Sequence, residues 1–366
     1  MPVNIAMRIC QCQWSFLSVL ITFMMVSFAC TAASGIERAQ MFTIEKLLDR
    51  PIIEPSLSSA IGDNIQGPSL IRVPDWVKQP LGAYYLYFAD HKGKYIRLAY
   101  ADDLTGPWKI HEPGSLQLVG SKFLLETPAV EPALLEQARK RVQATPYPHD
   151  IKLDLTVPHI ASPDVHIDAE KRKIIMYFHG LNAFASQVTR VAESTNGIDF
   201  VTNEEVLGRP YMRVFKHQGY HYAMSMPGQF YRSRDGLTNF ERGPGLFEAN
   251  MRHAALLVRD DKLLVFWTRV GDAPERILLS SIDITADWST WTPSGAVEIL
   301  RPEASWEGAG EPVLPSMRSV AYGHVNQLRD PAIYVEADRI FLLYAVAGEF
   351  GIAIAELHPT FVPGAL

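Results

Sequence analysis

Histidine and arginine recur at the ends of strand-like runs in this chain, with only a few carboxylates among them. Imidazole titrates near neutral pH and serves as a general acid or base, whereas guanidinium binds carboxylate or sulfate through charge-assisted hydrogen bonds. These residue types together indicate proton transfer on an anionic substrate. At the start of a run stand Asp164, Arg209, Arg213, Arg252, His253, Arg329 and Asp330, and at the end of the run that follows stand Asp90, His91, His179, Arg269 and Asp272.

Other familiar chemistries lack their sequence motifs. The chain has no G-x-S-x-G nucleophile motif, no phosphate-binding glycine loop and no H-E-x-x-H zinc motif. Imidazole with carboxylate is a common metal-ligand set, but no closely spaced ligand motif supports a metal ion here. We therefore expect neither a metal nor a cofactor.

The strands that carry these residues belong to a repeated unit. Ser162-Pro163-Asp164-Val165 opens a strand, and after a charged turn residues 173–180 form a second strand that ends in a polar residue. A third strand follows, then an Asp/Asn-Gly-type turn and an aromatic residue that begins a fourth strand. Similar units begin near Gly67, Arg209, Arg252 and Asp330. Repeated units of four strands predict an all-β fold, a five-bladed β-propeller with four-stranded blades.

The fifth unit ends after its third strand, near Leu357. We expect residues 42–53 to supply its outermost strand, which would close the ring by pairing the N- and C-terminal segments. Two stretches exceed a minimal blade, residues 113–158, with one helix expected at 132–143, and residues 301–328. Long insertions in repeat folds often shape a binding site.

The propeller topology gathers the polar residues. The first strand of each blade runs along the central channel and the second returns beside it. The start of the first and the end of the second therefore open on the same face. Histidines and arginines that are far apart in the sequence are expected to surround one site there.

The N-terminus has the layout of a secretory signal. Arg8 precedes an uncharged apolar run at residues 14–30 and the small residues that follow it, so we expect residues 1–33 to be a signal peptide and 34–366 a single domain. All three cysteines, Cys10, Cys12 and Cys30, lie in this segment. A secreted or periplasmic protein without disulfides is expected, with an uncleaved N-terminal anchor or a lipid on Cys30 as the alternatives. The net charge of -6 argues against binding to nucleic acid or to an anionic membrane.

The repeated unit resembles the five-bladed propellers of glycoside hydrolase family 43, which includes arabinanases and β-xylosidases. Ser162-Pro163-Asp164-Val165 is similar to that family's second-blade motif, whose aspartate tunes the acid and orients the substrate. The family's other two carboxylates are not matched. Gly67 stands at the position of the first-blade base, and Gly208 or Arg209 stands at the position of the third-blade acid. Asp63, Glu204 and Glu205 are the nearby alternatives.

Three hypotheses follow. The first is cleavage of a glycosidic bond in an acidic oligo- or polysaccharide, the second is β-elimination or dehydration of a uronic acid unit, and the third is a binding propeller without catalysis. Asp330 could equally cap a turn. The expected catalytic residues are Asp164, His179, His253 and His91, and the expected substrate-binding residues are Arg213, Arg252, Arg269, Arg329, Asp330 and Asp90.

Overall fold

The computed structural model describes residues 41–142 and 150–360. The predicted signal segment, residues 1–33 with its three cysteines, lies outside the described residues. In the described part, no helix is long and apolar enough to cross a membrane.

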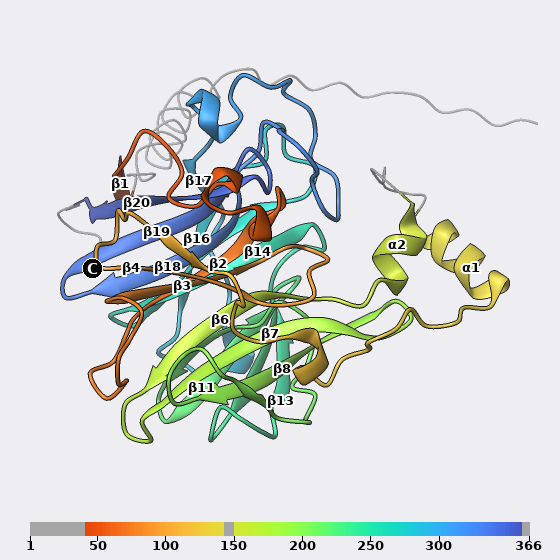
Figure 1. Ribbon diagram of the computed structural model, residues 1–366, viewed down its shortest axis with the longest axis horizontal. Coiled ribbons are helices and arrows are strands. Elements are labelled where there is room, and N and C mark those ends of the chain that lie inside the picture. The colour runs from red at the N-terminus through yellow and green to blue at the C-terminus, as the bar shows by residue number, and fades with distance from the viewer. Residues whose placement is uncertain (1–40, 143–149, 361–366) are drawn as a thin grey trace, which may run out of the picture. The chain divides into compact units, whose positions relative to one another are not determined.

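Five antiparallel sheets of four strands each form the propeller, as predicted (Figure 1). Blade 1 consists of β2 (Gln66–Arg72), β3 (Tyr84–Ala89), β4 (Arg97–Ala101) and β5 (Lys109–His111), and blade 2 of β6 (Ile160–Asp168), β7 (Lys173–Ala183), β8 (Ser186–Ser194) and β9 (Val201–Thr202). Blade 3 consists of β10 (Arg213–His217), β11 (Tyr220–Ser225), β12 (Gln229–Ser233) and β13 (Glu241–Gly245), and blade 4 of β14 (Met251–Arg259), β15 (Lys262–Arg269), β16 (Ile277–Asp283) and β17 (Val297–Leu300). Blade 5 consists of β18 (Arg329–Glu336), β19 (Arg339–Val346), β20 (Gly351–Pro359) and β1 (Phe42–Lys46).

The ring closes through the first described strand of the chain. β1 pairs antiparallel with β20, with Phe42 opposite Pro359 and Lys46 opposite Ala355. The Phe42 side chain is buried and packs against Phe266 of blade 4. The predicted closure of the ring is therefore confirmed, and the outer edge of β20 is covered.

The second strands of the blades are mostly buried because each sheet packs between two others. All six residues of β3 are buried. Tyrosines on these strands also link neighbouring blades. The Tyr87 hydroxyl donates to the Gly197 carbonyl, and the Tyr177 hydroxyl donates to the Gly236 carbonyl, both at 2.7 Å. These bonds satisfy two buried hydroxyl groups and fix the turns that precede the outer strands.

At the inner start of every blade one residue has a left-handed backbone conformation. The strand register slips at this point in four blades, and such a bulge redirects the side chain. Blade 3 has the equivalent residue just before β10 begins. The five residues, called the left-handed ring below, are Gly67, Ser162, Tyr211, His253 and Asp330, with φ between 40° and 64°.

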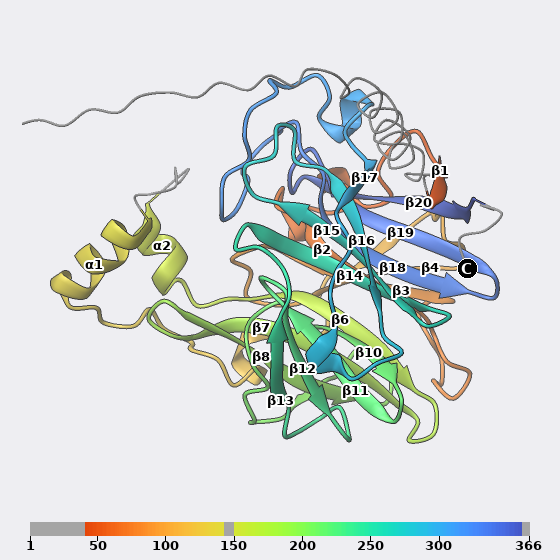
Figure 2. The same ribbon diagram turned by 180° about the vertical axis from the view of Figure 1, so that it is seen from behind.

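The two insertions extend the propeller. The first contains α1 (Pro132–Val142), close to the predicted helix, and α2 (Ile151–Thr156), and both lie to one side of the sheets in Figures 1 and 2. Asp150 caps α2 by accepting from the Lys152 N–H at 2.9 Å. The second insertion, residues 301–328, holds one short 3₁₀ turn. The 3₁₀ turns of the described chain are Pro55–Leu57, Ser59–Ile61, Leu118–Gly120, Trp288–Thr290 and Ser305–Glu307.

Candidate functional site

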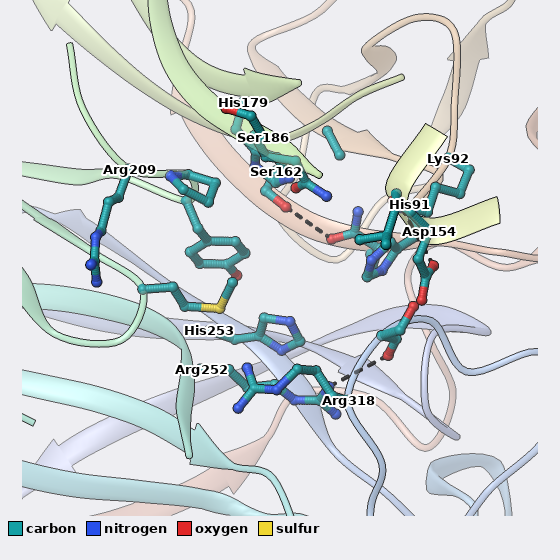
Figure 3. A pocket seen from close by; sticks show the side chains of 18 of the residues that line it. His91, Lys92, Asp154, Ser162, His179, Ser186, Arg209, Arg252, His253 and Arg318 are labelled. Carbon is teal, nitrogen blue, oxygen red and sulfur yellow. Dashed lines mark hydrogen bonds and ion pairs between the residues drawn. The ribbon is translucent and has the colours of Figure 1, made fainter. Parts of the chain in front are cut away.

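A cavity of about 480 Å³ opens where the inner strands of blades 1 to 4 begin (Figure 3). Both insertions contribute to its wall, the first through α2 and the second through residues 318 and 319. The chemically active side chains that line it are Gln66, His91, Lys92, Asp154, Ser162, His179, Ser186, Gln187, Arg209, Tyr211, Arg252, His253, Arg318 and Ser319.

Four of the predicted site residues line this cavity, namely His91, His179, His253 and Arg252. They come from the end of β3, the second strand of blade 2 and the start of blade 4. These four residues come from starts of first strands and ends of second strands, and they lie around one cavity. Burial, together with nearby positive charge, lowers the pKa of His179 and of His253 well below the ordinary imidazole value. Both rings are neutral at neutral pH.

Asp164 does not line the cavity, contrary to the expectation for a residue that orients the substrate. Its Oδ2 accepts from the Val214 N–H at 2.8 Å and lies 2.7 Å from Nε2 of His166. Ser162, two residues earlier, holds the left-handed position and faces the cavity instead. Asp164 thus joins blade 2 to blade 3. Burial raises its pKa, but His166 and Arg213 outweigh that effect and the pKa is lowered.

Replacing Asp164 by asparagine is expected to reduce the free energy of unfolding by about 1–3 kcal/mol at neutral pH. The charged oxygen that contacts both the Val214 N–H and the His166 ring would be replaced by a neutral amide group. The pKa of the folded carboxyl lies below that of the unfolded chain, so its contribution exists above about pH 4 and is lost on further acidification. Urea unfolding at several pH values should show the difference between wild type and variant vanish in acid. Asp260→Asn, at an exposed turn, is the control; a pH-independent loss at Asp164 would contradict the charge assignment.

Arg213 and Arg269 also lie outside the cavity lining. Arg213 donates to the backbone carbonyls of Ser162, Pro163 and Ala254 and lies over the Tyr211 ring at 4.3 Å. It therefore ties three blades together. Arg269 has Glu248 at 2.8 Å. Both arginines were expected to hold the substrate, and both have structural partners instead.

Asp90 and the alternative carboxylates are also off the cavity. Asp90 Oδ1 accepts from the Lys92 N–H at 2.7 Å, which shapes the turn after β3. Asp63 is exposed, Glu204 pairs with Lys122 at 3.0 Å, and Glu205 accepts from the Asn239 N–H. None of them lines the cavity.

Asp330 lies directly beneath the cavity floor, against Tyr211 and His253. Its Oδ1 accepts from the Tyr211 hydroxyl at 2.8 Å, and its Oδ2 lies 3.4 Å from Nδ1 of His253. Tyr211 and His253 stack with ring centroids 5.2 Å apart. Burial raises the pKa of Asp330 to about 6, and burial raises the pKa of Tyr211 well above its usual value. Three members of the left-handed ring thus form one titratable group, called the Tyr–His–Asp cluster below.

A network of buried charges supports the cavity. Glu275 accepts from Nε and Nη2 of Arg252 at 2.9 and 2.5 Å, and lies 3.5 Å from Arg329. Arg329 also donates to Glu349 at 2.6 Å, and Glu349 lies 3.3 Å from Nδ1 of His91. Burial raises the pKa of both glutamates, but Arg252 for Glu275 and His91 for Glu349 outweigh it, so both are lowered. Arg329 was expected to bind substrate, yet it is fully buried in this network.

Sequence reasoning did not identify Glu275, Glu349 or Asp154. The two glutamates follow second strands, β15 and β19, so the rule that selected His91 and His179 could have included them. Asp154 comes from α2 of the first insertion, where no repeat sets the register. It lies 3.5 Å from Lys92, whose pKa is lowered by burial. The insertion thus adds a buried ion pair to the cavity wall.

Among the described residues, no group of three or more His, Cys, Asp or Glu side chains is placed to hold a metal ion. The arrangement instead offers neutral imidazoles, a protonated phenol above a carboxyl group, and cations at the rim. Such a set can move a proton and bind an anion.

The fold is a five-bladed β-propeller, and solved glycoside hydrolases have a similar fold. A GH43_1 enzyme from Xanthomonas citri has TM-score 0.50 and 11% identity, covering 86% of this chain and 92% of that one. An exo-β-1,3-galactanase from Phanerochaete chrysosporium, solved with β-1,3-galactotriose, also has TM-score 0.50 and 11% identity, covering 88% of this chain and 67% of that one. At this identity the likeness establishes the fold.

The sequence itself has a nearer relative. Uncharacterized protein R118 of Acanthamoeba polyphaga mimivirus is 34% identical over 376 residues, covering 94% of this chain and 98% of the relative. The chain belongs to the same family as this mimivirus protein. No family model matches the chain.

Proposed function

We propose that this protein is a carbohydrate-active enzyme that cleaves a glycosidic bond in an anionic oligosaccharide. The observation that carries the proposal is the Tyr–His–Asp cluster, at the floor of a cavity that also collects His91, His179 and cationic side chains. A cavity of about 480 Å³ is in the range of small-molecule sites. The family 43 fold and the galactotriose complex of the galactanase support a sugar as the ligand.

His253 is the proposed proton-transferring residue. Its Nδ1 faces Asp330, and neither Nδ1 nor Asp330 Oδ2 has another hydrogen-bond partner among the described residues. Nε2 is then the nitrogen left for a ligand, and the neutral ring can accept a proton there. Tyr211 remains protonated at neutral pH, with its single hydroxyl proton directed to Asp330 Oδ1. It can donate that proton to the oxygen of the leaving sugar when Asp330 is itself protonated and donates to the phenol oxygen in turn; burial raises the pKa of Asp330 to about 6. Asp330 therefore positions two catalytic side chains.

The residues at two positions bear on the choice between hydrolysis and elimination. The resemblance to family 43 would place two of its carboxylates at Gly67 and at Gly208 or Arg209. Among the described residues that line the cavity, Asp154 is the one carboxylate, and Lys92 is its ion-pair partner. Hydrolysis by two facing carboxylates therefore has poor support. Elimination needs a neutral base to remove the proton alpha to a uronate carboxylate. The C–O bond to the leaving sugar then breaks, and the leaving oxygen takes a proton. The neutral histidines favour this second candidate.

Product analysis separates the possibilities. Incubation with uronate-containing and sulfated oligosaccharides is expected to release shorter sugars. Elimination yields an unsaturated uronate that absorbs in the near ultraviolet, and hydrolysis yields new reducing ends without that absorbance. Tight binding with neither product would leave the alternative of a binding propeller and would overturn the proposed enzyme.

Export is part of the proposal. The predicted signal peptide would bring the enzyme to extracellular or periplasmic polysaccharide. Mass spectrometry of the mature N-terminus after expression with the native leader tests it, and an intact Met1 would contradict cleavage.

A further inference from the structure

Arg209 is the unpaired cation of the cavity. The other cations that line it have partners: Lys92 lies 3.5 Å from Asp154, Arg252 binds Glu275, and Arg318 donates to the Ala249 carbonyl at 3.1 Å. Among the described residues, the Arg209 guanidinium has no hydrogen-bond or ion-pair partner, and the side chain is exposed. A charge left unpaired at a site is available for a ligand.

The backbone beneath this side chain is held firmly. The Arg209 N–H donates to the Tyr231 hydroxyl at 3.3 Å, and its carbonyl accepts from the Thr189 hydroxyl at 2.7 Å. The preceding carbonyl, of Gly208, accepts from the Thr189 N–H, and the following one, of Pro210, accepts from the Met226 N–H. Three consecutive residues are thus anchored to blades 2 and 3. Because the backbone of Arg209 is already fixed, less conformational entropy is lost when its guanidinium binds a ligand.

Arg209 also stands beside the Tyr–His–Asp cluster in sequence and in space. Tyr211 follows two residues later, and both line the same cavity. In Figure 3 Arg209 lies on the other side of His253 from His91, Lys92 and Asp154. A sugar ring in the cavity would therefore meet the cation at one edge and the buried Lys92–Asp154 pair at the other.

We infer that Arg209 is a specificity-determining residue that binds the carboxylate of a uronic acid unit; this inference rests on the proposed function. A planar guanidinium matches a planar carboxylate through two parallel hydrogen bonds. Binding the carboxylate withdraws electron density from it, which acidifies the alpha proton that elimination removes. A tetrahedral sulfate shares the charge but not that effect on a ring proton.

The test compares Arg209→Met, Arg209→Lys and a matched control, Arg259→Met, at the exposed far end of β14. Calorimetric titration with D-galacturonic acid, galactose 6-sulfate and D-galactose reads binding directly. Wild type and control are expected to prefer galacturonate over galactose by roughly 10- to 100-fold, and Arg209→Met is expected to lose that preference. Arg209→Lys should keep part of the preference for galacturonate, because lysine retains the positive charge but cannot form the two parallel hydrogen bonds of a guanidinium.

The outcomes separate the two proposals. Equal galacturonate preference in Arg209→Met and the control would overturn the role of Arg209. Stronger binding of the sulfated sugar would overturn the carboxylate assignment in favour of sulfate. A lost preference without any cleavage product from wild type would keep the anion site and remove the proposed enzyme. In kinetics with a uronate oligosaccharide, Arg209→Met should raise KM by the same factor by which it lowers the affinity for galacturonate. An unchanged KM would count against the role of Arg209.

Discussion

His253→Asn is expected to lower kcat on the cleaved oligosaccharide by about 100- to 10,000-fold, the usual contribution of a general acid or base. Asparagine tolerates the left-handed backbone at this position, where φ is 40°. Its amide also retains a donor toward Asp330. The substitution therefore removes the titrating nitrogen while it disturbs the cavity floor little.

The pH profile makes this prediction specific. The pKa of His253 is lowered, so the neutral base persists through neutral pH and is lost only on acidification. The acid limb of wild-type kcat/KM should fall below about pH 6.5, the ordinary imidazole value. His111→Asn, in the outer strand β5, is the control and should leave kcat unchanged. A folded His253→Asn protein with wild-type kcat would exclude this residue from the chemistry.

Glu349→Ala is expected to reduce the free energy of unfolding by about 3–5 kcal/mol, the usual cost of leaving a buried charge without its partner. Arg329 is fully buried and would keep one carboxylate partner, Glu275 at 3.5 Å, besides its neutral partners Gln327 and the Ser319 carbonyl. Asn64 would also lose the carboxylate that its side-chain amide meets at 2.8 Å. Urea denaturation followed by far-ultraviolet circular dichroism measures the loss.

Two further variants test the cause of the loss. Glu241→Ala breaks an ion pair with Arg232 in which the glutamate is 61% exposed, and it should cost at most about 1 kcal/mol. Arg329→Met combined with Glu349→Leu removes both charges and should cost much less than the two single losses added together. Additive losses in the double variant would mean that the two charges do not interact.

The blades were predictable because their signals are local and repeated. Each strand is short, apolar and bounded by a polar turn such as Asn196-Gly197 or Asp235-Gly236, and the same order recurs in every unit. The closing strand followed from topology, since the last unit lacked a fourth strand. Phe42 and its neighbours were the free segment with strand character.

The site was predictable only in part because its details depend on geometry that spacing does not reveal. The histidines at the ends of second strands could be placed by topology alone. The shift in strand register between Ala161 and Asp164 could not be predicted from the sequence. Because of this shift, Ser162 lines the cavity and Asp164 lies between blades 2 and 3. Arg252 and Arg329 were expected to bind substrate, but Arg252 forms an ion pair with Glu275 and Arg329 with Glu349.

Gly67 limits which sequences this propeller can reach by single substitutions. A Cβ added there would lie 2.9 Å from the Cα of Ser162, a backbone atom of the neighbouring blade. Any side chain at this point, including an aspartate in the place of the family base, would require blade 2 to move away from blade 1. A single substitution at position 67 therefore cannot place a carboxylate at the inner start of blade 1 without a shift of the neighbouring backbone.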